Sequence, residues 1–225
     1  MFRFFKQRFR LLTKTPVCQA CSAFIPQTPE GFCNVCLQNL NLRQWTPLHK
    51  GVELYAAAIL TPLLKRWIYG HKFYAKTDYA DRLAGLLQLA LAHTPPGIGP
   101  TGQTGFTLLP PHYGASPHFL PIALRLSKQL NLPLADGLLC WQRDILPQHQ
   151  LRHRSERMHN MAHALKADLS VLNRYGHINQ WIVLDDLTTS GASLKEALRA
   201  INTVPSKTVN SLTAIGLAIA HVPHL

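Results

Sequence analysis

Apolar and polar residues follow two different periods along the chain, and from residue 51 onward these periods alternate. Short continuous apolar runs are typical of buried strands, whereas apolar residues spaced three and four apart are typical of amphipathic helices. The predicted strands are residues 54–59, 106–109, 134–140, 181–186 and 212–220, and the predicted helices are residues 62–69, 79–92, 121–130, the second half of 141–165, and 193–201. Strands that alternate with helices in this way predict an α/β fold with a parallel sheet flanked by helices.

The N-terminal part of the chain lacks this alternation. Residues 1–14 carry apolar side chains three and four positions apart with Arg and Lys between them, which predicts a short basic amphipathic helix. Its apolar stripe fits packing on the protein body as well as contact with nucleic acid or membrane. Prolines break any long helix in residues 16–45. We therefore divide the chain into residues 1–46 and 47–225, with a Pro/Gly-rich surface loop predicted at residues 95–105.

Four of the five cysteines form two Cys-x2-Cys pairs, separated by eleven residues. They are Cys18, Cys21, Cys33 and Cys36. Each pair can present two thiolates to one tetrahedral ion, and a loop-rich segment of this size has too little core to fold without metal. We predict a structural zinc finger, because all four thiolates are needed to complete the coordination. Two incidental pairs of buried or redox-active cysteines are the alternative, and Cys140 is expected in the core.

The net charge and the hydropathy of the chain limit which binding partners and which cellular location we expect. The 225 residues carry a formal net charge of +12, so the surface should attract polyanions such as nucleic acid, phosphorylated ligands or anionic lipid, or be basic without a specific partner. No run of about 18 apolar residues occurs, which argues against a membrane-spanning helix. The N-terminus has charges throughout and lacks the apolar region of a secretory signal, so we expect a cytoplasmic protein.

An acidic pair follows the apolar run in W-I-V-L-D-D-L-T-T-S-G-A-S-L, residues 181–194, which has the form of strand, loop and helix. Asp185 and Asp186 stand where open α/β sheets bind ligands, at the carboxyl end of a strand. A loop of small and hydroxyl residues beside a helix N-terminus suits a phosphate group. We expect the phosphate to lie on Thr189, Ser190, Gly191, Ala192 and Ser193. A Mg²⁺ ion would reconcile two acids with an anionic ligand.

A plainer interpretation of the same residues remains open. Thr189 or Ser190 would cap an ordinary helix, and the two acids would lie near its N-terminus for electrostatic reasons alone.

The same stretch resembles the ribose-phosphate motif of type I phosphoribosyltransferases, in which an apolar strand ends in two acids and a Thr/Gly-rich loop follows. Four further features make nearly the whole chain similar to the ComF family of competence proteins: the double Cys-x2-Cys module, the basic helix that begins LLKRWIYGHK, the LLPPH strand, and the pattern Q-x-x-L-x5-R-x-x-N. This last pattern consists of Gln148, Leu151, Arg157 and Asn160.

The resemblance implies a type I phosphoribosyltransferase-like domain with an N-terminal zinc finger, acting in the cytoplasm on DNA taken up during natural transformation. It implies that Asp185 and Asp186 meet the ribose hydroxyls of phosphoribosyl pyrophosphate, bound with Mg²⁺. The 5′-phosphate of this ligand would lie on residues 189–193, and Cys18, Cys21, Cys33 and Cys36 would hold zinc.

Two departures from the family pattern favour ligand binding over catalysis. Family members commonly continue the LLPPH strand into a basic loop of the type Arg-Gly-Phe-Asn that faces pyrophosphate. This chain has Ser116-Pro117-His118-Phe119-Leu120-Pro121 there, without the guanidinium. Thr188 also replaces an apolar residue of the motif, and Ser190 replaces a threonine.

Three functional interpretations follow: a protein that handles single-stranded DNA and binds phosphoribosyl pyrophosphate, an active phosphoribosyltransferase on an unknown acceptor, or a scaffold that docks a DNA helicase or recombination mediator. Single-stranded DNA needs a positive groove and aromatic rings on which bases stack. The cationic candidates are Lys65, Arg66, Lys72, Lys76, Arg152, Arg154 and Arg157, and the rings are Trp67, Tyr69, Phe73 and Tyr74. The arginines before the acidic strand could instead cover pyrophosphate, or form a solvated basic loop.

Overall fold

The computed structural model describes residues 18, 21, 32–40, 42, 47–74, 76–94, 100–111, 117–147, 150–204 and 212–223. Some sequence predictions lie outside these residues: the basic helix at 1–14, residues 95–99 of the predicted surface loop, Ser116 of the altered loop, and Gln148.

The described helices are α2 (Asn34–Leu40), α3 (Pro62–Tyr74), α4 (Thr77–Ala92), α5 (Leu120–Leu130), α6 (Arg154–Met161), α7 (Leu169–Arg174) and α8 (Ala192–Asn202). The described strands are β1 (Leu54–Ile59), β2 (Thr104–Leu108), β3 (Leu134–Ala135), β4 (Leu139–Trp141), β5 (Leu165–Ala167), β6 (Gln180–Thr188) and β7 (Thr213–His221). None of these helices has the length and apolar character required to cross a membrane.

Five strands form one sheet in the order β1-β7-β6-β2-β3, and every neighbouring pair is parallel. Strands β4 and β5 form a separate antiparallel pair. Parallel strands covered on both faces need apolar side chains in both directions, which explains the continuous apolar runs in the sequence. The predicted α/β fold, a parallel sheet flanked by helices, is confirmed.

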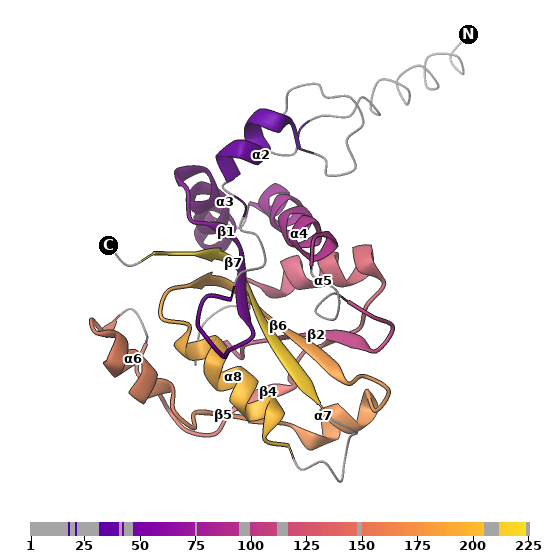
Figure 1. Ribbon diagram of the computed structural model, residues 1–225, viewed down its shortest axis with the longest axis vertical. Coiled ribbons are helices and arrows are strands. Elements are labelled where there is room, and N and C mark those ends of the chain that lie inside the picture. Colours follow the sequence, from indigo (N-terminus) through magenta and orange to yellow (C-terminus); the bar gives the residue numbers. More distant parts are fainter. Residues whose placement is uncertain are drawn as a thin grey trace.

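The two faces of the sheet are covered by different parts of the chain (Figure 1). Side chains alternate along β6, so Ile182 and Leu184 pack into the core formed with α3, α4 and α5. Trp181 and Val183 point the other way and pack into the core formed with α8, β4 and β5. This alternation continues into the two acids that follow.

The order of the strands places a crevice at the carboxyl ends of β2 and β6. From β2 the chain passes through α5 to β3 on one side, and from β6 it passes through α8 to β7 on the other. The helices α5 and α8 therefore diverge from neighbouring strands on opposite faces. Open α/β sheets bind ligands at such a switch point.

Several boundaries differ from the sequence prediction. Strand β6 continues past the acids to Thr188, because Leu187 and Thr188 still pair with β7. Strand β2 starts at Thr104, inside the predicted loop 95–105, where Thr104 bonds to Gln180 of β6. The predicted strand 134–140 is divided between β3 and β4, which belong to different sheets, with a turn at Gly137 in a left-handed conformation.

The cysteine segment packs directly on α3. The rings of Phe32 and Trp67 stack with their centroids 6.5 Å apart, and both side chains are fully buried. Cys18, Cys36 and Leu40 belong to the same apolar core. The four-cysteine group is thus joined to the helical layer that covers one face of the sheet.

We predict that Gly105→Ala destabilises the protein by about 1–3 kcal/mol, because the added methyl would force Trp181 out of its packed position. A Cβ at Gly105 would lie 2.7 Å from Cζ3 of Trp181, whose side chain is fully buried. Urea unfolding followed by circular dichroism measures this. Gly102→Ala is the control, since a Cβ there meets nothing within 4 Å. Equal unfolding midpoints for the two variants would show that Trp181 does not pack tightly against Gly105.

Candidate functional site

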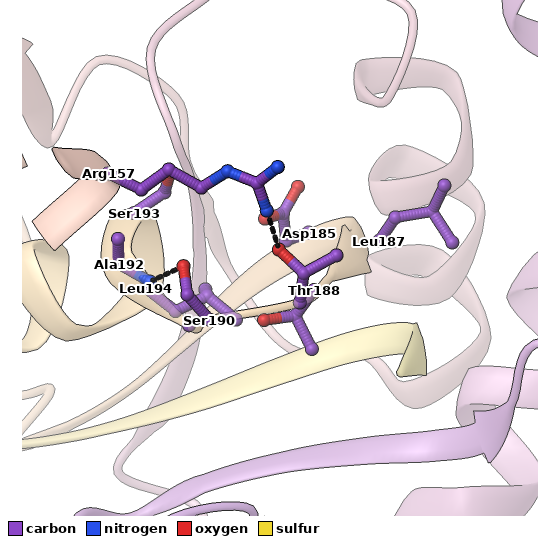
Figure 2. A pocket seen from close by; sticks show the side chains of 10 residues that line it. Arg157, Asp185, Leu187, Thr188, Ser190, Ala192, Ser193 and Leu194 are labelled. Carbon is purple, nitrogen blue, oxygen red and sulfur yellow. Dashed lines mark hydrogen bonds between the residues drawn. The ribbon is translucent and has the colours of Figure 1, made fainter. Parts of the chain in front are cut away.

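A cavity of about 280 Å³ lies where β6 ends and α8 begins (Figure 2). It is lined by Arg157, by Asp185 and by every residue of 187–194. All five residues predicted to hold the phosphate, 189–193, line this cavity. The cavity lies at the carboxyl end of β6, one of the two strands that meet at the switch point, and open α/β sheets bind ligands at such ends.

The loop between β6 and α8 turns at Gly191, which has φ of +72° and precedes the first residue of α8. A Cβ at this position would approach Nε2 of His49 to 3.0 Å, so both conformation and space favour glycine. Ser190 is buried, and its hydroxyl lies 3.4 Å from the backbone N of Ala192. Gly191, at the N-cap position of α8, has no side chain to cap the helix. The Ser190 hydroxyl accepts a long hydrogen bond from the backbone N–H of Ala192, so Ser190 satisfies one N–H of the first turn, as the plainer interpretation expects.

The two acids of β6 have different surroundings. Asp185 lines the cavity, whereas Asp186 faces the layer of α3 and α5. Side chains alternate along a strand, which favours different partners for adjacent residues, while the carboxylate of Asp186 still lies close enough to raise the pKa of Asp185. The cavity therefore receives one of the two predicted carboxylates.

Asp186 is held by two basic side chains. Nζ of Lys72 on α3 lies 2.9 Å from its Oδ2, and Nε2 of His118, just before α5, lies 3.0 Å from the same oxygen. Burial alone would raise the pKa of Asp186, but the hydrogen bond from His118 and the ammonium of Lys72 outweigh it and lower the pKa. His118 thus occupies the position of the altered loop and contacts an acid.

Asp185 has the opposite electrostatic environment. Burial, and then the negative charge of Asp186, raise the pKa of Asp185 well above its usual value. Its Oδ1 accepts a hydrogen bond from the backbone N–H of Asp186 at 2.8 Å. A cation or hydrogen-bond donors brought by a ligand would stabilise the ionised form of Asp185.

Arg157 reaches the cavity from α6. Its Nη1 donates to Oγ1 of Thr189 at 3.0 Å (Figure 2). Its Nε donates to the carbonyl of Leu151 at 3.0 Å. Asn160, one turn later, exchanges two hydrogen bonds with the backbone of Leu146. The motif residues Leu151, Arg157 and Asn160 therefore fasten the segment before α6 and place one guanidinium over the predicted phosphate loop.

The residues predicted to bind DNA divide into two groups. Lys72 pairs with Asp186, and Arg157 lines the cavity, with Arg154 on the same helix and Arg152 just before it. Lys65 and Arg66 lie exposed on α3, and Lys76 lies exposed just after it. Trp67 is buried in the core, whereas the rings of Phe73 and Tyr74 are 64% and 74% exposed.

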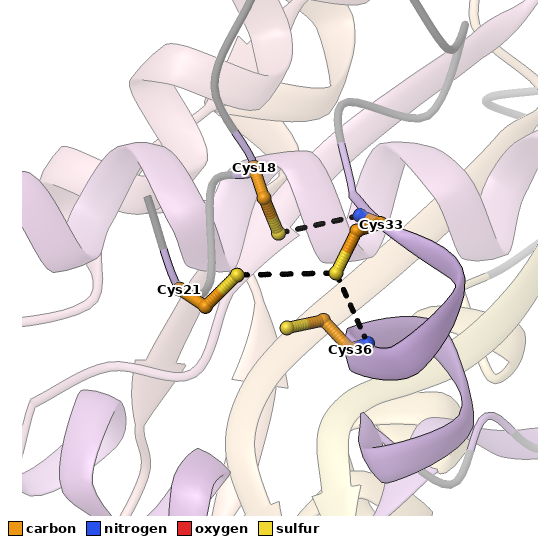
Figure 3. A group of neighbouring side chains, drawn as sticks. All are labelled: Cys18, Cys21, Cys33 and Cys36. Atoms are coloured by element: carbon orange, nitrogen blue, oxygen red, sulfur yellow. Dashed lines mark hydrogen bonds between the residues drawn. The ribbon is translucent and has the colours of Figure 1, made fainter. Parts of the chain in front are cut away.

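The four predicted zinc ligands converge. Their sulfur atoms all lie within 4.8 Å of one another and point to one centre (Figure 3). Backbone N–H groups of Cys33 and Cys36 donate to Sγ of Cys18 and Cys33 at 3.3 and 3.4 Å. Burial and the neighbouring thiols raise the pKa of Cys36, and a divalent cation at the centre would reverse this by stabilising the thiolates. This donor set and spacing fit zinc.

Some contacts of the site could not be found from the sequence. Lys72 and His118 are 114 and 68 residues from Asp186, and no local pattern marks them as its partners. No sequence pattern predicted that His49 would lie against Gly191 either. Cys140, expected in the core, is only partly buried on β4, where its Sγ lies 3.6 Å from the carbonyl oxygen of Lys166.

We predict that Cys21→Ser removes most of the bound zinc and lowers the thermal unfolding midpoint, because three thiolates leave the tetrahedral coordination incomplete. Zinc content is measured by atomic emission and stability by differential scanning calorimetry. Cys140→Ser, outside the cluster, is the matched control and should keep both values. Unchanged zinc content in Cys21→Ser would contradict the assignment.

Comparison with known proteins adds no family assignment. The chain matches no model of a known protein family and no curated protein sequence. The resemblance to the ComF family therefore remains a prediction from the motifs of the chain.

Proposed function

We propose that this protein is a ComF-like protein of natural transformation whose type I phosphoribosyltransferase-like domain binds phosphoribosyl pyrophosphate. The observation that carries the proposal is the convergence of Asp185, Arg157 and the loop 189–193 on one cavity at the switch point of the sheet. An acid, a guanidinium and a helix N-terminus in one cavity match the hydroxyls and the phosphate of a sugar phosphate.

Each group has a distinct task in this proposal. Backbone N–H groups of residues 189–193 and Arg157 hold the 5′-phosphate, while Asp185 accepts hydrogen bonds from the ribose hydroxyls. Mg²⁺, bound with the pyrophosphate, supplies positive charge that favours the ionised form of Asp185. Asp186 fixes the strand to the opposite layer through Lys72 and His118.

Binding is better supported than turnover. Transfer of the phosphoribosyl group requires pyrophosphate to leave with its charge neutralised. In the stretch where the family pattern has its basic loop, this chain has no arginine, and the ring of His118 there contacts Asp186. An active phosphoribosyltransferase with an unknown acceptor remains the alternative, as does a scaffold that docks a helicase or recombination mediator through the zinc finger.

We predict that Asp185→Asn weakens binding of phosphoribosyl pyrophosphate with Mg²⁺ by about 10- to 100-fold, because it removes a charged acceptor from the cavity. Asp186→Asn should lower the unfolding free energy by about 1–3 kcal/mol and change the affinity only a few fold. Isothermal titration calorimetry and urea unfolding separate the two effects. Wild-type affinity in Asp185→Asn would remove the basis for the proposed site.

A second activity, binding of single-stranded DNA, is favoured by one surface of α3. Nζ of Lys65 lies over the ring of Tyr69, 5.4 Å from its centroid, and Tyr69 packs edge-on against Phe73 with centroids 5.5 Å apart. With Tyr74, these side chains form an exposed row of rings and cations. Exposed rings can stack on bases while cations follow the phosphates, which is how sequence-tolerant single-strand binders work.

We predict that Lys65→Glu with Arg66→Glu weakens single-stranded DNA binding by about 10-fold or more at low salt and reduces the salt slope by about 2. Fluorescence anisotropy with a labelled oligonucleotide over a salt series measures both. Lys128→Glu with Lys166→Glu makes the same charge change at exposed sites on α5 and β5. An equal loss in this control, or no binding by the wild type at low salt, would exclude the α3 surface.

A further inference from the structure

A second group of basic side chains gathers beside the loop 189–193, and it comes from three separate parts of the chain. His49 precedes β1, Arg154 is the first residue of α6, and Lys195 lies in the first turn of α8. Nη2 of Arg154 lies 3.1 Å from Nδ1 of His49, and the His49 ring lies against Gly191. The backbone N–H of Lys195 donates to the carbonyl of Gly191 at 2.8 Å. His49 therefore adjoins the proposed phosphate loop, Lys195 follows the loop by one turn of α8, and Arg154 contacts His49, all beside the residues that line the cavity.

This arrangement is electrostatically unfavourable without an anion. Burial, and then the charges of Lys195, Arg154 and His221, lower the pKa of His49. Burial, and then the charge of Arg154, lower the pKa of Lys195. Lys195 also lies in the N-terminal turn of α8, where the helix dipole disfavours a cation. Like charges placed together in a partly buried position indicate a functional site when a ligand can neutralise them.

His49 determines where the Arg154 guanidinium lies. A guanidinium only donates hydrogen bonds, so Nδ1 of His49 must be the acceptor, and the ring must be neutral. The lowered pKa of His49 is consistent with this form. Nε2 of His49 is buried, so the ring contributes by positioning rather than by contact with an anion. Arg154 is exposed and Lys195 half-buried, which leaves both accessible.

We propose that Arg154 and Lys195, with His49 as the positioning residue, form a second anion subsite that binds a further phosphate group of the ligand in the cavity. The inference rests on the proposed function, because the first phosphate is taken to lie on residues 189–193. The further phosphate is either the diphosphate on C1 of the ribose or a second phosphate attached to the 5′-phosphate.

Two ligand pairs test the subsite and distinguish these sources. Ribose 5-phosphate is compared with phosphoribosyl pyrophosphate, and AMP with ADP, each titrated calorimetrically with Mg²⁺. In the wild type, either phosphoribosyl pyrophosphate should bind more tightly than ribose 5-phosphate, or ADP more tightly than AMP. In that pair, Lys195→Met should lower the affinity for the ligand with more phosphate groups about 10-fold and change the affinity for the ligand with one phosphate by no more than about twofold. Lys128→Met, which removes an exposed lysine from α5 on the opposite face, should change neither.

Stability and a conservative variant provide further readouts. Because Lys195→Met relieves repulsion, we expect its unfolding midpoint to rise while its affinity falls, which a purely structural lysine would not do. His49→Leu should weaken the same ligand as Lys195→Met, and His49→Gln, which keeps an acceptor for Arg154, should restore most of the affinity.

The possible failures are distinguishable. If the wild type binds ribose 5-phosphate or AMP but Lys195→Met and Arg154→Met leave every affinity unchanged, the subsite is overturned and the proposed function stands. If the wild type binds none of the four ligands, the cavity assignment fails and the subsite with it.

Discussion

The alternation of side chains along β6 is the constraint on which the rest of the site depends. Asp185 and Asp186 are adjacent on the central strand, where side chains alternate in direction, and they meet different partners. One carboxylate therefore enters the cavity, and the other is available to bind Lys72 and His118. The layer of α3 and α5 is thereby fixed to the same strand that positions the proposed ligand site.

This division gives the two acids opposite electrostatic environments. The basic partners of Asp186 keep it ionised, and its charge in turn helps to raise the pKa of Asp185. An acid in the cavity that is hard to ionise suits a ligand that brings donors and a metal ion. The surroundings are strongly basic, because Arg157 and the cluster at His49 adjoin the same loop.

Helix α3 connects three features of the molecule. Its buried face carries Trp67, which stacks on Phe32 of the cysteine segment, and its end carries Lys72, which pairs with Asp186. Its exposed face carries the row of Lys65, Tyr69 and Phe73. The four-cysteine group, the acidic strand and the proposed DNA surface therefore all contact the same helix.

Features that depend on residues close together in the chain could be predicted from the sequence. They are the strand–helix alternation, the four converging cysteines, and a loop at 189–193 that lines a cavity. Periodicity and short spacings encode these directly. Strand ends such as Thr188 and Thr104 were predicted less accurately, because pairing with a distant strand determines where a strand ends. Only the tertiary structure could separate Asp185 from Asp186 and bring His118, Lys72 and His49 to the site. The order of the strands brings these residues together, and that order cannot be predicted from short patterns in the sequence.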